Sequence, residues 1–277
     1  MPKLPFTKIP KKFLLPGIIV LVLLLVGAAW LWQRNSQQQA ENTQKTSTKK
    51  KVSQPVNVIP VADRPYMTLT PSSDGHYITL AIKEVKKDAS KVDYEMEYQT
   101  GSMLQGFQGL LTLKNGQAEE KKLFGSQSAG GAITYHEDIT GGSFLAQFEG
   151  GSEDYAVKSA WRYFTNKDKE SSFSSQDGKF SIENASLAKV SHLVIYNVPG
   201  YPGKISQELL SDPYALSADS SLESLSSNFT VTLHSSSEEA VILGYDGQKW
   251  QELDTSVSDG KATTTSPYMP LYVLAKK

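Results

Sequence analysis

The chain has 277 residues, enough for one or two domains with buried cores. Its 28 basic and 29 acidic residues give a formal net charge of -1, which excludes a global positive field that would attract nucleic acid or anionic lipid. No cysteine is present, which excludes disulfides, thiolate metal sites, thiol nucleophiles such as those of sortase-type transpeptidases, and lipid attachment through an N-terminal cysteine.

Residues 13–32 form an apolar segment that predicts a single transmembrane helix. No charged or strongly polar residue occurs from Phe13 to Trp32, and about 20 apolar residues span a bilayer core as a helix. Trp30 and Trp32 stand at its end, where aromatic rings favour the headgroup layer. A cleaved signal peptide is the alternative, because the small residues at 26–28 suit a signal peptidase, but apolar signal regions run only about 7 to 15 residues. We therefore expect an uncleaved, single-pass signal-anchor.

The basic residues around this segment predict its orientation. Four lysines precede it, whereas only Arg34 and Lys45 follow closely. Because basic residues are retained on the cytoplasmic side, we expect residues 1–12 in the cytoplasm and the C-terminal domains outside it.

Residues 33–57 are mostly Gln, Asn, Ser, Thr and Lys. Such a segment buries too little apolar surface to offset its ordering entropy, so it predicts a disordered stalk that holds the rest of the chain off the membrane.

After the stalk the apolar residues recur at every second position. KVDYEMEYQT alternates apolar with acidic residues, and HYITLAIKEV repeats the pattern, as half-buried antiparallel strands do. Asn115-Gly116 predicts a hairpin turn. With about eight strands expected, the size typical of a sandwich, residues 58–165 predict a first β-sandwich domain.

The polar break TNKDKESSFSSQDG precedes a second group of strands. KFSI, HLVIYNV, FTVTLH, AVILGY, KWQEL, ATTTS and LYVLA are strand-like, and KISQELL at 204–210 has the apolar spacing of one short helix. Residues 172–277 therefore predict a second sandwich. The expected fold is all-β, with two tandem antiparallel β-sandwich (Ig-like) domains after the transmembrane helix and the stalk. One continuous larger sandwich is the alternative.

The stretch ILGYDGQKWQELDT allows two interpretations. Asp246 and Trp250 could face a ligand, or Asp246-Gly247 could turn a hairpin whose tryptophan enters the core. A buried indole gains more from burial than an exposed one, so we expect a core tryptophan.

The C-terminal segment resembles the closing hairpins of Ig-like or fibronectin type III-like β-sandwich modules, with a Y-D-G-x-x-W-x-x-L turn before a Y-x-L-A strand. The matching residues are Tyr245, Asp246, Gly247, Trp250, Leu253, Tyr272, Leu274 and Ala275. YEMEYQTGSMLQGFQGLLTL and LFGSQSAGGAITYHEDI are similar to a group of uncharacterised bacterial surface proteins with one N-terminal span. In that group the loop after LFG often carries a cysteine pair, where this chain has Gln127 and Gly131. The resemblance implies a sandwich fold and assigns no activity.

Candidate catalytic and metal-binding residues are few. The four histidines show no pair at ligand spacing, and adjacent residues of His136-Glu137-Asp138 would point to opposite faces of a strand. Ser186-Leu187-Ala188-Lys189 matches S-x-x-K, but the K-T-G element of penicillin-recognising enzymes is missing. We therefore expect no catalytic residue, no cofactor and no metal.

Three tyrosines flank the long Pro- and Gly-interrupted connection VPGYPGKISQELLSDPY. They are Tyr196, Tyr201 and Tyr214. Because recognition concentrates on loops held by a rigid sandwich, they are the candidate binding residues, and a packed structural crossover is the alternative.

Three functions remain open. The first is a non-enzymatic, membrane-anchored extracytoplasmic protein for adhesion or cell-envelope interaction, with a surface protein or a glycan as partner and no nucleic acid. The second is an accessory subunit of a membrane or envelope complex. The third is an envelope-polymer hydrolase that uses a carboxylate pair the sequence does not reveal.

Overall fold

The computed structural model describes residues 55–220, 222–225 and 227–277. The expected cytoplasmic segment 1–12, the expected transmembrane helix 13–32 and most of the expected stalk 33–57 lie outside these residues. Within the described ranges, no helix combines the length and the apolar character that crossing a membrane requires. The described part of the chain belongs to one compact unit.

Strands make up nearly all of the regular structure, which confirms the all-β prediction. Those of the first half are β1 (Tyr66–Pro71), β2 (Tyr77–Glu84), β3 (Lys91–Thr100), β4 (Met103–Thr112), β5 (Ala118–Leu123), β6 (Gly125–Gln127), β7 (Ile133–Tyr135), β8 (Ile139–Glu149) and β9 (Tyr155–Thr165). Those of the second half are β10 (Ser172–Ser174), β11 (Phe180–Glu183), β12 (His192–Asn197), β13 (Tyr214–Ala218), β14 (Phe229–His234), β15 (Ala240–Tyr245), β16 (Trp250–Glu252), β17 (Thr255–Ser258), β18 (Lys261–Ser266) and β19 (Leu271–Lys276). Three short 3-10 helices also occur in the described residues, η2 (Val61–Asp63), η3 (Ala185–Lys189) and η4 (Leu222–Ser224).

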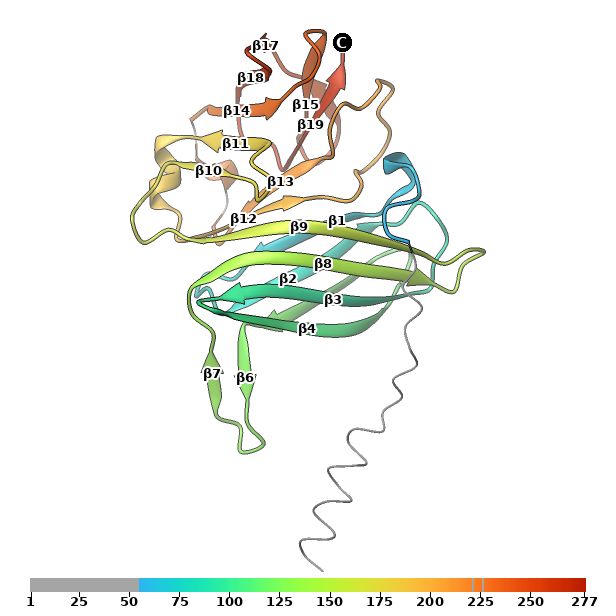
Figure 1. Ribbon diagram of the computed structural model, residues 1–277, viewed down its shortest axis with the longest axis vertical. Helices are drawn as coiled ribbons and strands as arrows, with labels where there is room; N and C mark the ends of the chain where they lie inside the picture. The colour runs from blue at the N-terminus through green and yellow to red at the C-terminus, as the bar shows by residue number, and fades with distance from the viewer. Residues whose placement is uncertain (1–54, 221, 226) are drawn as a thin grey trace, which may run out of the picture. The chain divides into compact units, whose positions relative to one another are not determined.

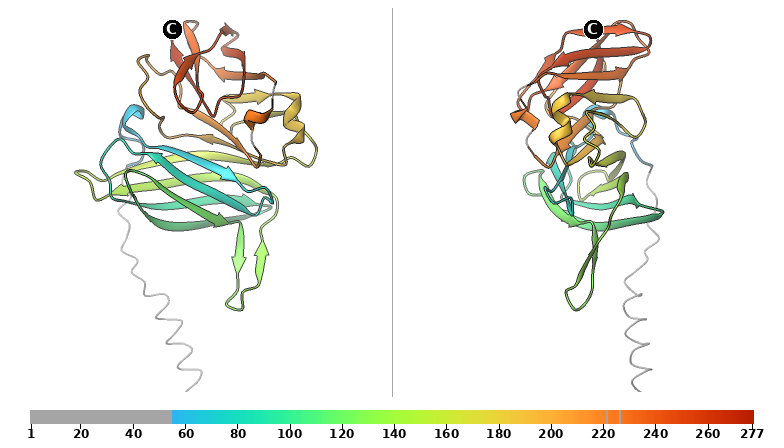
Figure 2. Two further views of the ribbon diagram at one scale, coloured as in Figure 1. Left: turned by 180° about the vertical axis from the view of Figure 1, so that it is seen from behind. Right: turned by 90° about the vertical axis from the view of Figure 1, so that its left-hand side faces the viewer.

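One large antiparallel sheet runs through both halves. Its strand order is β16-β15-β19-β13-β12-β9-β8-β3-β4, so β9 of the first half pairs directly with β12 of the second (Figure 1). Two smaller sheets accompany it, β1-β2-β5 and β10-β11-β14-β18-β17. The β6-β7 hairpin extends away from the other strands (Figures 1 and 2).

The small sheets cover different parts of the large one. The first core lies between β1-β2-β5 and the large sheet, where Tyr94, Met96 and Tyr98 of β3 are buried beside Trp161 of β9. The second lies between β10-β11-β14-β18-β17 and the large sheet, and includes Phe180. The two layers in each half are visible from the side (Figure 2).

Strand β12 serves both cores because its faces are covered by different sheets. Val194 and Tyr196 belong to the first core. Leu193 and Ile195, which point the other way, belong to the second. This double burial explains why HLVIYN is a nearly continuous apolar run rather than an alternating one.

The Asp-Gly turn at 246–247 joins β15 to β16, and the tryptophan after it is half-buried against the core. The Trp250 indole nitrogen donates to the carbonyl of Pro202 at 2.8 Å, and its ring meets Tyr201 edge-on. The indole packs against the core with its polar atom satisfied, but it is half-buried rather than the core residue expected.

Two details of the sequence analysis need correction. The short helix expected at 204–210 is wrong: the segment is irregular, Leu209 forms a bridge with Ala275 of β19, and Ile205 and Leu209 cover apolar side chains of β15 and β19. Seven residues are too few to hold a helix against such packing. At the end of the expected stalk, Val56 forms a parallel bridge with Ala156 of β9, so the last stalk residues lie on the fold.

Candidate functional site

The outer face of the first-half sheet carries a surface groove. In β3 the alternation that buries Tyr94 and Met96 turns Glu95 and Glu97 outward. The second small sheet covers this side of the large sheet in the second half, but not over β4, β3 and β8. We call the outward side of β4, β3, β8 and β9 the open face.

A groove of about 620 Å³ lies on the open face. More of its surface is apolar than polar, and charged and amide side chains stand among the lining residues: Val56, Asn57, Glu97, Gln99, Leu104, Thr140, Gly141, Gly142, Ser143, Lys158, Ser159, Ala160 and Gln176. A second depression of about 420 Å³ continues from it over β3 and β4 and shares Glu97 and Leu104 with it. The small residues of β8 and β9 leave the backbone accessible, so a ligand can approach the sheet closely.

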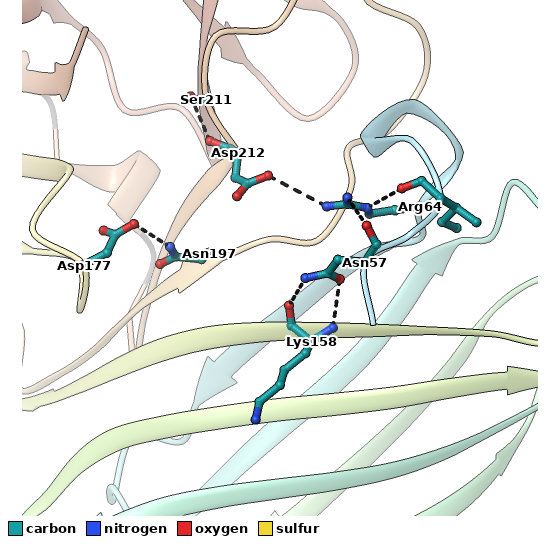
Figure 3. Close-up of polar contacts among 8 residues, drawn as sticks. Asn57, Arg64, Lys158, Asp177, Asn197, Ser211 and Asp212 are labelled. Atoms are coloured by element: carbon teal, nitrogen blue, oxygen red, sulfur yellow. Dashed lines mark hydrogen bonds and ion pairs between the residues drawn. The ribbon is translucent and has the colours of Figure 1, made fainter. Parts of the chain in front are cut away.

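Two opposite charges stand in this groove. Glu97 accepts a hydrogen bond from the Ser143 hydroxyl at 3.1 Å, which orients its carboxylate. The Lys158 side chain extends from β9 toward the neighbouring strand β8 (Figure 3). Within the described residues its ammonium group has no ion pair, so it is available to an incoming anion, hydroxyl or carbonyl oxygen.

The segment that leads into the first strand forms one wall of the groove. Asn57 holds both backbone groups of Lys158: its amide nitrogen donates to the Lys158 carbonyl at 2.8 Å, and its side-chain oxygen accepts from the Lys158 amide at 3.0 Å (Figure 3). Arg64 fixes the same segment by donating to the carbonyls of Asn57 and Ile59, each at 2.9 Å. Its third contact is an ion pair of 3.8 Å with Asp212 (Figure 3).

The three tyrosines predicted as binding residues are buried. Tyr196, Tyr201 and Tyr214 keep at most 4% of their surface exposed. Tyr196 and Tyr201 belong to the first core and Tyr214 to the second, so they do not share one surface. Their rings therefore offer no face to solvent, whereas the binding role of the connection between them stays a prediction.

Tyr214 has a structural partner in Asp177, at the turn between β10 and β11. Its hydroxyl donates to the Asp177 carboxylate at 2.8 Å, and Asn197 donates to the same oxygen at 3.0 Å (Figure 3). Burial raises the pKa of Asp177, but hydrogen bonds from Ser175, the Lys179 amide, Tyr214 and Asn197 outweigh it and hold the pKa below its ordinary value. The carboxylate thus ties the β10-β11 turn to β12 and β13.

Three of the four histidines meet at one end of the first core. His76, His136 and His192 line a cavity of about 240 Å³ together with Tyr163. His192 Nδ1 lies 3.0 Å from the Tyr163 hydroxyl, and His136 Nδ1 lies 2.9 Å from the Tyr98 hydroxyl. Across the described ranges, no group of three or more His, Asp or Glu side chains is arranged to hold a metal ion.

The sequence analysis did not identify the groove residues as a set. Alternation alone turns Glu97 outward, but Glu97, Lys158 and Asn57 come from segments far apart in the chain. The pairing of β3 with β8 and of β8 with β9 brings them together. Such long-range pairing leaves no local signal in the sequence.

Comparison of the chain with protein-family models, with curated proteins and with solved structures finds no match in any of the three.

Proposed function

We propose that the chain is a non-enzymatic, membrane-anchored extracytoplasmic protein that binds a polar partner through the open face, in adhesion or cell-envelope interaction. The observation that supports it is the groove itself. It brings together a carboxylate and an ammonium group from β3 and β9 with the amides of Asn57, Gln99 and Gln176, of which only Gln99 lies on the sheet. Such groups match the hydroxyl and amide groups of a glycan or of an extended surface peptide.

The carboxylates of the groove favour binding over hydrolysis. Glu95 and Glu97 lie two positions apart on one strand and point the same way. Cleavage of a glycosidic bond requires two carboxyl groups that flank the bond from opposite sides. A hydrolase remains the competing function, and the experiment below distinguishes it.

The test measures retention of the full-length chain, in detergent, on purified cell-wall polymer and on a glycan array. Glu97→Gln and Lys158→Ala each remove one charge without touching the backbone contacts of Asn57. Loss of a hydrogen bond to a charged group costs about 1.5–3 kcal/mol, so each variant should bind about tenfold or more weakly. Glu183→Gln and Lys179→Ala are matched controls, because both side chains are exposed on or beside β11, away from the groove.

Three outcomes would overturn the proposal. Unchanged binding in both groove variants would show that the partner binds at another part of the surface. Soluble fragments released from the polymer, and lost in Glu97→Gln, would favour the hydrolase. A C-terminal tag that resists protease on intact cells and becomes cleavable after lysis would place the domains in the cytoplasm.

An accessory subunit of an envelope complex is the other alternative. A blue-native gel of the detergent extract distinguishes it, since a subunit would migrate with unrelated chains whereas an independent binding protein would not.

A further inference from the structure

The sheet edges differ sharply in how they are protected. Strands β10, β16 and β17 have only three or four residues, β5 carries four consecutive charged residues at 119–122, and β1 lies against β12 and β13. Short length, charge and cover are the usual means by which proteins keep edges from pairing with other chains.

The edge strand β4 is protected neither by short length nor by charge, and outside the large sheet it contacts β5, which follows it along the chain. Strand β4 is ten residues long, MLQGFQGLLT, with no charged residue and no proline. It pairs with β3 alone, so within the described residues its other edge has no partner strand. Met103, Leu104 and Leu110 are 59%, 63% and 64% exposed, an unusual amount of apolar surface for one edge.

The sequence of β4 is complementary to itself when reversed. Residues 104–110 read L-Q-G-F-Q-G-L, centred on Phe107. In an antiparallel pair with a second copy about this centre, Leu104 lies opposite Leu110, and each glutamine lies opposite a glycine. In this pair, leucine meets leucine and each long glutamine side chain meets a glycine. Because the strand carries no charge, the two edges do not repel each other electrostatically.

We propose that two copies of this chain associate through β4, as an antiparallel pair centred on Phe107 that joins their large sheets into one. The proposal rests on the edge of β4 and not on the identity of the groove's ligand, but the pair would bring the second copy close to Glu97 and Leu104, which also line the groove.

The neighbouring strand supports this register. Gly106 and Gly109 are fixed by packing within one copy, because a Cβ atom would lie 2.7 Å from the Met96 carbonyl oxygen or from the Tyr94 ring, respectively. The exposed backbone of Gly106 leaves room on the open face for Gln108 of the second copy, whereas the Tyr94 ring fills the space over Gly109. Glu97 lies beside Gly106 on the open face, so Gln108 of the second copy would extend over Gly106 toward this carboxylate as a hydrogen-bond donor.

Disulfide cross-linking tests the register, because the native chain contains no cysteine. In the proposed pair, position 104 faces position 110 of the second copy at the Cα separation of about 4.5–5.5 Å that a disulfide accepts. Position 104 lies about 20 Å from its own counterpart along the strand, so a single cysteine cannot reach itself.

The variant Leu104→Cys combined with Leu110→Cys, in full-length chain in native membranes under mild oxidation, should therefore yield a covalent dimer. Either substitution alone should yield none. No dimer from the double variant overturns the proposal, and so does equal cross-linking of the single variants, which would indicate random collision or another register.

A second measurement follows the association itself. Gln108→Glu would place a carboxylate against Glu97 of the second copy, and would set two like charges diagonally across the interface, about 7–8 Å apart. Native mass spectrometry of the full chain in detergent should show a dimer for the wild type and a monomer for Gln108→Glu. Ser256→Glu, at an exposed position of edge strand β17, is the matched control and should remain dimeric. A monomeric wild type, or a dimer that Gln108→Glu leaves intact, contradicts the proposal.

Discussion

His192 is held in a confined polar site at the end of the first core. Its ring contacts the Tyr163 hydroxyl, and a Cβ atom at Gly75 would lie 2.3 Å from its Cε1 atom. Gly75 has a φ of +71°, so the close approach and the backbone torsion both require glycine. Burial lowers the pKa of His192 from its ordinary 6.5, and His76 adds to this, whereas Asp219 and Asp74 raise it.

Because the folded state holds this pKa below its unfolded value, the unfolded chain binds more protons at pH values just below 6.5. The stability that this site contributes is therefore fully present above pH 6.5. It is lost as the pH falls below 6.5 and through the lower pKa of the folded state. We expect the unfolding free energy, measured by denaturant titration from pH 7.5 to 5, to fall less steeply in His192→Gln than in the wild type. His234→Gln, at an exposed position, should keep the wild-type slope; identical slopes in all three proteins would contradict this assignment.

For single residues, the sequence predicts strand membership better than it predicts exposure to solvent. Tyr196 is on a strand as expected, whereas Tyr214, expected at the end of a connection, begins strand β13, which was not predicted. The burial of both depends on two small sheets that cover opposite faces of the large one. The residues next to either tyrosine in the sequence do not indicate that a second sheet will bury it. The three histidines of the cavity present the same difficulty, since the topology alone brings them together.

At the scale of elements, the contacts of residues 56–64 secure the segment that precedes β1. Asn57 has a φ of 59° and clamps Lys158 through its side chain. Asn57→Gly keeps this backbone conformation available while removing both side-chain hydrogen bonds.

We expect Asn57→Gly to accelerate hydrogen exchange at Lys158 and in residues 56–64, and to change the global unfolding free energy by less than about 1 kcal/mol, because exposed hydrogen bonds contribute little net stability. Hydrogen exchange followed by mass spectrometry measures both regions. Asn115→Gly, at the turn after β4 with a φ of 53°, is the control and should leave residues 56–64 unchanged. Wild-type exchange in Asn57→Gly would show that Arg64 and the backbone bridge of Val56 hold the segment without the Asn57 side chain.

Long strands with strong alternation, such as β2 and β3, could be predicted from sequence. Strand β10 could not, because SSFSS lies in a polar segment and only Phe173 marks it as buried. The hairpin at Asn115-Gly116 was predicted as a turn, and both residues have positive φ. Its two strands nevertheless belong to different sheets, which a local turn signal does not specify.

For the molecule as a whole, the large sheet links the two cores. Strand β12 contributes alternate side chains to each, so disrupting one core disturbs a strand of the other. The division into domains 58–165 and 172–277 therefore stays a prediction that unfolding can test.

We expect a single calorimetric transition for the described part of the chain. Met96→Ala in the first core and Leu274→Ala in the second should each cost about 2–5 kcal/mol and lower that same transition. Two resolved transitions, each sensitive to only one of the substitutions, would instead support two independently folding domains.

The bridge between Val56 and Ala156 determines how the fold responds to mechanical tension. Pulling on the chain from its N-terminal side loads this bridge and the Asn57 and Arg64 contacts before the strands of the two cores. We expect these contacts to break first, which would free the residues that precede β1 and leave both cores folded. Because Val56 and Asn57 line the groove, the same rupture would remove that part of the groove's wall.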